Sequence, residues 1–324
     1  MRTFFLPYII DPKTGEDLKI EIVLEKDGQV LEGYLVSPSN RYPIVRGVPR
    51  FAGYQDDKNY TASFSDEWTR WPTTEFESKN KGKPMEGHTM RMWERITGMT
   101  GNIPGAIIAD IGCGPGRFIE ISRMKGASVI GIDMSDAVDP AADFFRTDQN
   151  VLICQADILQ SPIKNNSVDG CFSFGVLHHS ASPQGGFKEM VRVTKPGGWI
   201  SVSVYGPGGV YDSFIITNYR RLFKALWPLF GSYPPLMYSY AIAYITYPIA
   251  KSRRLYQLLK PILGYFPHAA LADLEWSVLT TFDAVTPTNQ VGISLYELFQ
   301  WFKQAKLHDI EPGSWKGSNL TARK

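Results

Sequence analysis

The sequence predicts an α/β protein with a doubly wound, parallel sheet, preceded by a small β-rich module and interrupted by a helical insertion. Two observations predict the sheet. Short apolar segments recur from about residue 105, and the intervals between them leave room for crossover helices. A third observation is a glycine-rich turn directly after the first of these segments, which is typical of a strand that leads into a nucleotide-binding helix.

The composition is that of an ordinary globular protein. The 324 residues are 44% hydrophobic and 20% charged, and the net charge of +2 gives no general reason to expect nucleic acid as a partner. The cysteines (Cys113, Cys154 and Cys171) have the spacing of neither a disulfide framework nor a zinc site, which favours a reducing, cytoplasmic compartment. Pro7 and Asp11 interrupt the apolar start of the chain, so no export signal is expected.

Residues 1–55 are expected to form the β-rich module. Residues 18–36 have the pattern of a hairpin with Asp27 and Gly28 at its turn. Residues 56–104 mix aromatic and charged residues in a helical pattern and are expected to link the module to the next domain.

Residues 105–324 are expected to form the α/β domain, with a helical insertion at 206–275. The expected strands of the sheet are 105–111, 127–133, 150–157, 168–175 and 199–205. The tail repeats the alternation once more, with a helix at 295–305, a strand at 306–313 and an extended segment at 318–324.

The glycine-rich turn, Asp110-Ile111-Gly112-Cys113-Gly114-Pro115-Gly116, is the first candidate binding element. Glycines have no Cβ, so the backbone of the turn can approach a ligand closely. The helix that follows directs its free N–H groups and positive dipole end at the turn. Such a turn can hold a phosphate or the carboxylate of an amino acid, and the alternative is a simple tight turn between strand and helix.

Acidic residues after the turn narrow the choice of ligand. Asp133 ends the next strand, where a carboxylate accepts both ribose hydroxyls of a nucleotide, including NAD. Two residues oppose a dinucleotide: Arg117 occupies the third glycine position, and the charge of Asp110 would repel a pyrophosphate. An acid at 110 suits the ammonium group of a methionyl moiety instead. Asp157 and Ile158 follow the third strand, where they could meet an adenine.

The segments ADIGCGPGRF, GIDMS, QADILQSPI, VDGCFSFGVLHH and KPGGWISVSV follow one another in the order and spacing of the class I methyltransferases. The resemblance, which is to the type 11 members, covers roughly residues 88–205 and recurs in the last 35 residues. It implies a Rossmann-like domain that binds S-adenosyl-L-methionine. The implied cofactor residues are Asp110, Gly112, Gly114 and Gly116 at the methionine end, Asp133 at the ribose, Met134, Asp157 and Ile158 at the adenine, Phe174 and Gly175 near the transferable methyl group, and Phe64 and Trp68 on a covering helix.

Three of these assignments have open alternatives. Asp157 could cap a helix or turn, Met134 could be an ordinary packing residue, and Phe64 and Trp68 could belong to a core between domains.

The N-terminal module resembles the small zinc-ribbon-like domains related to the activator subunit of tRNA methyltransferases. The resemblance rests on DPKTGEDL and LVSPSNRYPIVRGVPRF, where two pairs of cysteines would hold zinc in metal-binding relatives. The equivalent positions here are Asp11, Thr14, Ser37 and Asn40, so no metal is expected. Hydrophobic packing and side-chain hydrogen bonds in turns would have to stabilise the module, which is expected to have a structural or docking role.

Candidate catalytic residues follow the fourth and fifth strands. His178 and His179 could take a proton from a hydroxyl or amine acceptor, and Tyr205 ends the fifth strand. The alternatives are histidines satisfied by the backbone and a tyrosine used for packing. Methyl transfer from a sulfonium also needs mainly proximity and orientation, so a dedicated base is not required.

The insertion is aromatic and acid-free. No acidic residue occurs between Asp212 and Asp273, whereas seven residues there are basic: Arg220, Arg221, Lys224, Lys251, Arg253, Arg254 and Lys260. The stretch 225–250 is long enough to span a membrane, but its prolines and tyrosines favour a broken helical lid that covers an apolar acceptor site. The basic residues could meet an anionic group on the acceptor or anionic lipid through 213–272. A cationic surface or a homodimer contact is the alternative.

The resulting hypothesis is a cytoplasmic S-adenosylmethionine-dependent methyltransferase, with peripheral membrane contact as an option. Its acceptor is expected to be a hydrophobic or lipid-like small molecule, with or without an anionic group, and neither nucleic acid nor metal is expected as a partner. A cofactor-binding scaffold or regulatory pseudo-methyltransferase is the main alternative. A nicotinamide-dependent oxidoreductase is a further one, which Arg117 opposes.

Overall fold

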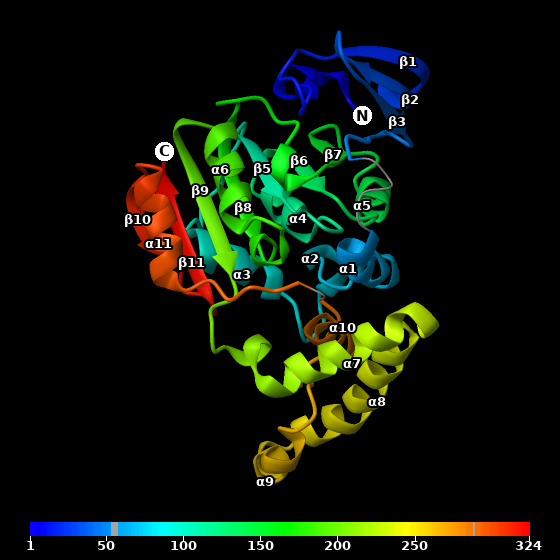
Figure 1. The fold of residues 1–324 in the computed structure, drawn as a ribbon, viewed down its shortest axis with the longest axis vertical. Coiled ribbons are helices and arrows are strands. Elements are labelled where there is room, and N and C mark those ends of the chain that lie inside the picture. The colour runs from blue at the N-terminus through cyan, green and yellow to red at the C-terminus, as the bar shows by residue number, and fades with distance from the viewer. Residues whose placement is uncertain (53–57, 288) are drawn as a thin grey trace.

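The N-terminal module is a four-stranded antiparallel sheet. The computed structural model describes residues 1–52, 58–287 and 289–324, and the expected boundary between residues 55 and 56 lies outside them (Figure 1). The strands are β1 (Lys19–Lys26), β2 (Gln29–Val36), β3 (Arg41–Val45) and β4 (Val48–Pro49), after a short helix η1 (Thr3–Tyr8). The predicted hairpin is confirmed, because Asp27 and Gly28 form the β1–β2 turn with φ of 52° and 67°.

In this module the buried carboxylate of Asp11 accepts hydrogen bonds from several side chains. Asp11 accepts hydrogen bonds from the hydroxyls of Ser37 and Tyr42, at 2.6 Å each, and from the side-chain amide of Asn40 at 2.8 Å. The backbone N–H of Thr14 also donates to it, at 3.4 Å. Asp11, Thr14, Ser37 and Asn40 are the four positions that correspond to zinc cysteines in the resemblance, so the fold brings these positions together around a carboxylate.

The central sheet has seven strands in the order β10-β11-β9-β8-β5-β6-β7. Five of them are parallel: β5 (Ile107–Ile111), β6 (Ser128–Asp133), β7 (Val151–Gln155), β8 (Val168–Phe174) and β9 (Thr194–Val204). At one edge β10 (His308–Pro312) and β11 (Ser318–Arg323) run antiparallel. The predicted doubly wound α/β sheet is confirmed.

Helices cover both faces of this sheet (Figure 1). One buried cluster includes Phe187 of α6 (Pro183–Val193) and Phe302 of α11 (Leu295–Gln304), and it continues into the N-terminal module. The other cluster packs against helices on the opposite face, namely α3 (His88–Thr97), α4 (Arg117–Met124) and α5 (Val138–Phe144). Shorter elements are α2 (Glu77–Asn80), η2 (Ile158–Gln160) and η3 (Leu177–His179).

The module docks beside β7, the strand at the other edge of the sheet. The backbone N–H of Phe51 donates to the carbonyl of Gln155 at 2.8 Å, and the Arg50 guanidinium donates to the Gln155 side chain at 3.0 Å. Arg50 also pairs with Asp139 of α5 at 2.5 Å. The Gln155 amide in turn donates to the carbonyl of Met134 at 3.2 Å, so the module contacts the edge of the predicted cofactor site through one residue.

Two helices lie over the carboxyl ends of the parallel strands, α1 (Lys58–Arg70) and α10 (Leu274–Val285). The insertion forms η4 (Val210–Asp212), α7 (Phe214–Phe230), α8 (Tyr233–Ala250) and α9 (Arg253–Leu263), which form an outer layer beyond α10 (Figure 1). Trp71, Ala243 and Phe282 join α8 and α10 to the chain just after α1 in one buried cluster. Among the described residues, no helix combines the length and apolar character that crossing a bilayer requires.

Candidate active site

A cavity of about 520 Å³ lies at the carboxyl ends of the parallel strands, beneath α1 and α10. It is lined from the strand ends by Gly112, Gly114, Asp133, Met134, Asp157, Ile158, Phe174, Gly175, Val176, His179 and Tyr205. The roof contributes Phe64 and Trp68 from α1 and Trp276, Leu279 and Asp283 from α10. Most of the residues singled out in the sequence therefore meet in one space, and both roof helices contribute aromatic rings to it.

The glycine turn forms one wall of the cavity. Gly112, Gly114 and Gly116 have φ of 81°, 52° and 99°, a region that side chains other than glycine rarely adopt. A Cβ on Gly112 would lie 2.3 Å from Cγ1 of Val176, so no larger residue fits there. Trp68 lies over Gly114, with its indole nitrogen 3.4 Å from the place of a Cβ. The turn is therefore a bare backbone surface beneath an aromatic ring.

Asp133 is fixed beside this turn because β5 and β6 are neighbouring parallel strands. One of its carboxyl oxygens accepts from the Gly114 backbone N–H at 2.9 Å. The other accepts from the Ser135 backbone N–H at 2.8 Å and from its hydroxyl at 2.6 Å. Burial raises the pKa of Asp133, and these hydrogen bonds oppose that rise. A carboxylate has about four acceptor positions, so Asp133 retains acceptor capacity toward the cavity.

Met134, Asp157 and Ile158 line the same half of the cavity, at the ends of β6 and β7. Asp157 is also the N-cap of η2, where it accepts from the Leu159 backbone N–H at 2.8 Å. The capping alternative considered for Asp157 is thus present, and it uses only one carboxyl oxygen. The other remains for the cavity.

Three of the predicted site residues do not line the cavity: Asp110, Gly116 and His178. Asp110 lies inside β5 with one carboxyl oxygen buried and unpartnered, and burial together with Asp133 raises its pKa well above the ordinary range. Gly116 begins α4, where a Cβ would lie 2.6 Å from the Phe145 ring. The structure therefore places these three predicted site residues outside the cavity lining, and it supports no direct contact between them and a ligand.

The two histidines differ in position. His178 is buried behind the wall, its ring between those of His179 and Tyr205, with centroid distances of 4.1 and 4.2 Å. His179 lines the cavity, and its Nδ1 lies 2.6 Å from the carbonyl oxygen of Asn289. A nitrogen facing a carbonyl must carry the hydrogen, so the neutral ring has its free lone pair on Nε2. Burial lowers the pKa of His179 to about 4, which makes it a weak base.

Tyr205 lines the cavity just past the end of β9 and stacks on Tyr211, with ring centroids 4.4 Å apart and an interplanar angle of 4°. Burial raises its pKa well above the ordinary value, so the phenol stays protonated at neutral pH. It can therefore donate a hydrogen bond but does not supply a phenolate.

Several ionisable residues of the cavity were not expected from the sequence as site residues: Glu67, Glu75 and Asp283, with Arg117. Arg117 forms an ion pair with Glu75 at the start of α4, next to the glycine turn. A sequence pattern could have identified both Glu67 and Asp283 as interior acids. Each occupies a position in an apolar helical stripe, Phe64-Glu67-Trp68 in α1 and Trp276-Leu279-Asp283 in α10. An acid in such a stripe faces the interior.

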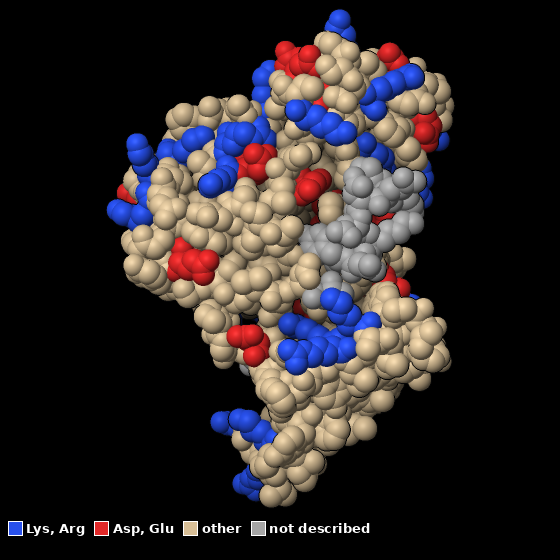
Figure 2. Space-filling model, in the orientation of Figure 1, with Lys and Arg blue, Asp and Glu red and all other residues tan. Residues whose placement is uncertain are grey.

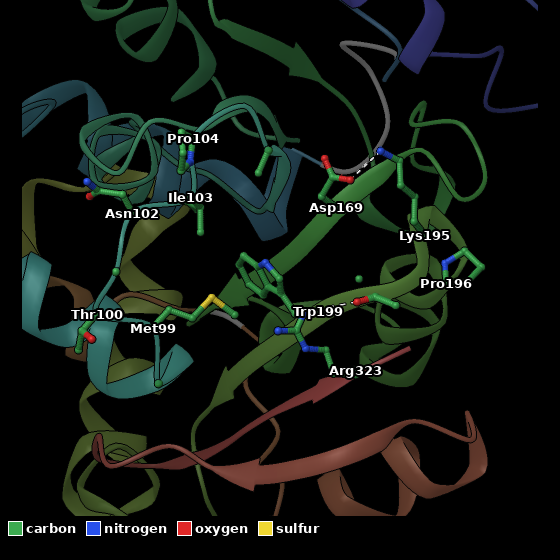
Figure 3. A pocket seen from close by; sticks show the side chains of 15 residues that line it. Met99, Thr100, Asn102, Ile103, Pro104, Asp169, Lys195, Pro196, Trp199 and Arg323 are labelled. Atoms are coloured by element: carbon green, nitrogen blue, oxygen red, sulfur yellow. Dashed lines mark hydrogen bonds and ion pairs between the residues drawn. The ribbon is translucent and has the colours of Figure 1, made fainter.

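A second hollow lies at the opposite ends of the strands, between the segment around Met99 and the start of β9 (Figure 3). Its charged groups are already paired. Asp169 binds the Lys195 ammonium at 2.7 Å and accepts from the Ile107 backbone N–H at 2.8 Å, and the Arg323 guanidinium donates to the Gly197 carbonyl at 3.3 Å. We assign no chemistry to it.

Comparison with known proteins concerns the same region. Residues 109–202 match the family model described as a methyltransferase domain. The match covers less than a third of the chain and describes this segment as a methyltransferase domain. The predicted class I fold and the S-adenosylmethionine cofactor are confirmed for this domain. The match begins at residue 109, so the likeness of the N-terminal module to zinc-ribbon domains stays a prediction.

Curated relatives match the methyltransferase domain over about 120 residues. A mouse tRNA (carboxymethyluridine(34)-5-O)-methyltransferase is 35% identical over 118 residues, which are 35% of this chain and 17% of the mouse protein. A malonyl-[acyl-carrier protein] O-methyltransferase from Serratia marcescens is 31% identical over 119 residues, or 37% and 46% of the two chains. The chain thus spans less than half the length of these relatives.

Among solved structures, a phosphoethanolamine N-methyltransferase from Haemonchus contortus, in complex with phosphomonomethylethanolamine and S-adenosylhomocysteine, is 17% identical. Its TM-score is 0.42, and the alignment covers 76% of this chain and 45% of that one.

The geometry of the cavity fits the cofactor of the methyltransferase domain. A nucleoside needs a carboxylate at the end of the second strand and an apolar slot beside it, which Asp133, Met134 and Ile158 would supply. The methionine end needs backbone that no Cβ blocks, which Gly112 and Gly114 supply. The volume of about 520 Å³ is within the range of ligand sites.

Proposed function

We propose that this protein transfers a methyl group from S-adenosylmethionine to a small-molecule acceptor that is apolar or lipid-like. The observation that carries the proposal is the single cavity that joins the glycine turn, Asp133 and an aromatic roof. A site of this kind holds the donor at the strand ends and leaves its other half, beneath α10, for the acceptor.

The order of the strands in the sheet separates the place proposed for the cofactor from the place proposed for the acceptor. The ends of β6 and β7 would hold the nucleoside, with Asp133 on the ribose, Asp157 at the adenine edge, and Met134 and Ile158 along its faces. Phe174 ends β8 and would lie below the methyl group. The amino and carboxyl groups of the methionine would meet the turn.

Arg117 supports this orientation of the methionine end. Its guanidinium lies at the start of α4 beside the turn and lines the cavity, where it can meet a carboxylate. Asp110 would act on the ammonium group through a neighbour, because its side chain is buried beneath the turn.

The cofactor supplies an electrophilic methyl group on a sulfonium sulfur. The protein has to align the acceptor with that group and exclude water. Phe64 and Trp68 would cover the donor from α1, and His179 and Tyr205 stand at the acceptor side. The insertion extends this lid, because α7 and α8 pack on α10.

The surface of the outer layer supports a contact with a membrane. In α9 and just beyond it, Leu258, Ile262 and Tyr265 are 75%, 62% and 70% exposed, at spacings of four and three residues that align them on one side. Arg253, Arg254 and Lys260 flank this stripe. Figure 2 shows that the end of the molecule formed by α7 to α9 carries basic and uncharged atoms on this face. An anionic lipid surface is complementary to both features.

The basic residues of the insertion support a contact with anionic lipid more than a contact with the acceptor. All seven are described, and none of them lines the cavity. An anionic acceptor would therefore meet them only outside the cavity. A second copy of the chain on the same apolar layer is the alternative occupant.

The comparisons bear on nucleic acid as an acceptor class. The mouse relative carries tRNA in its name, so the sequence-based expectation that nucleic acid is not a partner has no support from the comparisons. Total tRNA therefore belongs among the acceptors to be tested.

The test combines cofactor binding with transfer. Calorimetry should show binding of S-adenosylmethionine, and labelled methyl groups should enter the lipid-soluble fraction of an extract of the native cells. Label in the tRNA or in small polar metabolites alone would contradict the lipid-like acceptor. Binding without transfer to any fraction would favour the scaffold alternative.

A further inference from the structure

The cavity contains an unusual group, the carboxyl of Glu67. Its side chain is completely buried and lines the cavity, and neither of its oxygens has a hydrogen-bond partner. An unpartnered buried carboxyl costs free energy, so such a group is retained where a ligand supplies the missing partner.

The charged groups that face Glu67 do not neutralise it. Asp283 approaches from α10 and Glu75 from the chain after α1, and both are acids; Asp66 is its neighbour on α1. Arg117 is the nearest cation and is already paired with Glu75. Burial, with Asp283 and Glu75, raises the pKa of Glu67 well above the ordinary range, against the pull of Arg117. Glu67, Glu75 and Asp283 thus form an acidic wall of the cavity, in which acidic side chains outnumber the nearby basic one, Arg117.

Asp283 forms the other side of this acidic wall. Burial raises its pKa to about 6, with Glu75 adding to the rise and Arg220 opposing it. Arg220 donates to the Ala284 carbonyl at 2.8 Å, and its Nη2 has no partner within the part of the chain that the structure describes. It lies behind the wall and not in the cavity lining.

The acidic wall lies on the side of the cavity that we propose for the acceptor. The nucleoside half of the cavity belongs to β6 and β7, whereas Tyr205 and Tyr211 follow β9, on the other side of the glycine turn in the sheet order. Asp283 lines the cavity from α10, the roof helix above the half proposed for the acceptor, and it is the charged group that affects the pKa of Glu67 most.

We propose that Glu67 and Asp283 bind the O–H or N–H group that receives the methyl group, and that Glu67 accepts its proton. This proposal rests on the proposed function. The acceptor oxygen or nitrogen forms a bond to the methyl carbon while the bond from carbon to sulfur breaks, and its electron pair stays on sulfur. The proton of the acceptor passes to the Glu67 carboxylate, which releases it to solvent after the product leaves.

The acidic wall disfavours acceptors that are already negatively charged. A carboxylate or phosphate oxygen has no proton for Glu67 to accept at neutral pH, and it would bring its negative charge beside Asp283. His179 is a poor alternative base, because burial lowers its pKa to about 4. The methyl group should therefore be found in an ether or an amine and not in an ester.

The first experiment uses the full-length protein with labelled S-adenosylmethionine and the extract of the native cells. The labelled product is treated with mild alkali, which releases methanol from methyl esters and leaves ethers and amines intact. Retention of the label supports the proposal, and its release as methanol overturns it. If the wild-type protein does not bind S-adenosylmethionine at all, the proposed function fails instead, so the two failures are distinguishable.

The second experiment tests the two residues. Glu67→Gln keeps the shape and should lower the transfer rate by about 100-fold or more, the usual contribution of a general base. It should also abolish the rise of rate with pH that accompanies ionisation of Glu67. Asp283→Asn should mainly raise the extract concentration that gives half-maximal rate. Glu275→Gln, at an exposed position at the start of α10 where the carboxyl accepts from the Thr74 hydroxyl, is the control and should change neither.

Cofactor affinity provides a readout that is independent of activity. Both variants should bind S-adenosylmethionine and S-adenosylhomocysteine as the wild type does, which also shows that they fold. If Glu67→Gln lost affinity for the charged S-adenosylmethionine but not for S-adenosylhomocysteine, the carboxyl would serve the sulfonium, and the proposal would be wrong. A transfer rate close to that of the wild type, with an unchanged pH profile, would overturn it as well.

Discussion

Gly112 and Val176 touch across the turn between β5 and α4: a Cβ on the glycine would lie 2.3 Å from Cγ1 of the valine. Gly112 also has a φ of 81°. We therefore expect Gly112→Ala to displace the turn and abolish cofactor binding, measured by calorimetry, with a destabilisation of about 2–4 kcal/mol in urea unfolding.

Gly105 is the matched control for this prediction, because it has a φ of 74° and nothing within 4 Å of its Cβ position. Gly105→Ala introduces the backbone strain without the clash and should retain cofactor binding. Val176→Gly should partly restore binding to Gly112→Ala. Full binding by the single Gly112→Ala variant would show that the turn is not part of the cofactor site.

Asp133→Ala should sharply weaken the binding of S-adenosylmethionine. The change removes the proposed acceptor of the ribose hydroxyls and the partner of the Gly114 N–H. Hydrogen bonds to charged groups contribute about 1.5–3 kcal/mol, which corresponds to a loss of roughly 10- to 100-fold in affinity. Calorimetry checks this, with the exposed Asp143→Ala as the control. Unchanged affinity would refute the placement of the ribose.

Leu258→Glu should reduce binding to vesicles that contain anionic lipid. Leu258 is 75% exposed in the apolar stripe of α9, so the change adds no strain and leaves the fold intact. It removes apolar area and places a negative charge at an anionic surface, which should lower co-sedimentation by about 10-fold. Neutral vesicles and Gln257→Glu on the same helix are the controls. If the variant alters only the oligomeric state, the layer is an interface between two copies.

Asp11→Asn should destabilise the N-terminal module. The amide brings two hydrogens into a site where Ser37, Asn40 and Tyr42 already donate. We expect a loss of about 2–4 kcal/mol in unfolding free energy. Asp17→Asn, which removes only an exposed ion pair with Lys164, should cost less than about 1 kcal/mol. Equal stability of the two variants would mean that Asp11 does not organise the module.

Asp283→Asn should stabilise the protein above pH 6. Burial raises the pKa of Asp283 to about 6, against about 3.9 in an unfolded chain. The folded protein therefore binds more protons between these values, so this group lowers stability as the pH rises through that window. The variant should have a flatter pH dependence there and about 1–3 kcal/mol more stability at pH 7.5, measured by urea unfolding. A less stable variant would indicate that the carboxylate is held by Arg220.

The glycine turn and Asp133 could be found in the sequence because their signals are local. A glycine needed at positive φ, and an acid at the end of the next parallel strand, are determined by the strand–turn–helix unit that contains them. The paired N-terminal strands were predictable for the same reason, since Asp27 and Gly28 define their turn.

The directions of several other side chains could not be predicted from the local sequence. The place of Asp110 beside the turn predicts a side chain that faces the ligand, but in the folded chain its carboxyl is buried within β5. His178 and His179 are adjacent in sequence, yet only His179 reaches the cavity. The direction of a side chain at a strand end depends on what packs against it, and that is a tertiary property.

The sequence by itself thus determined the sheet, the nucleotide-binding turn and the class of cofactor, because these follow from backbone geometry over a few dozen residues. Only the tertiary structure decided the chemistry of the acceptor half. Glu67 and Asp283 lie on helices from opposite ends of the chain and meet because α1 and α10 both pack across the open ends of the strands. The local pattern of each helix indicates a buried acid, but only packing between distant segments brings the two acids together.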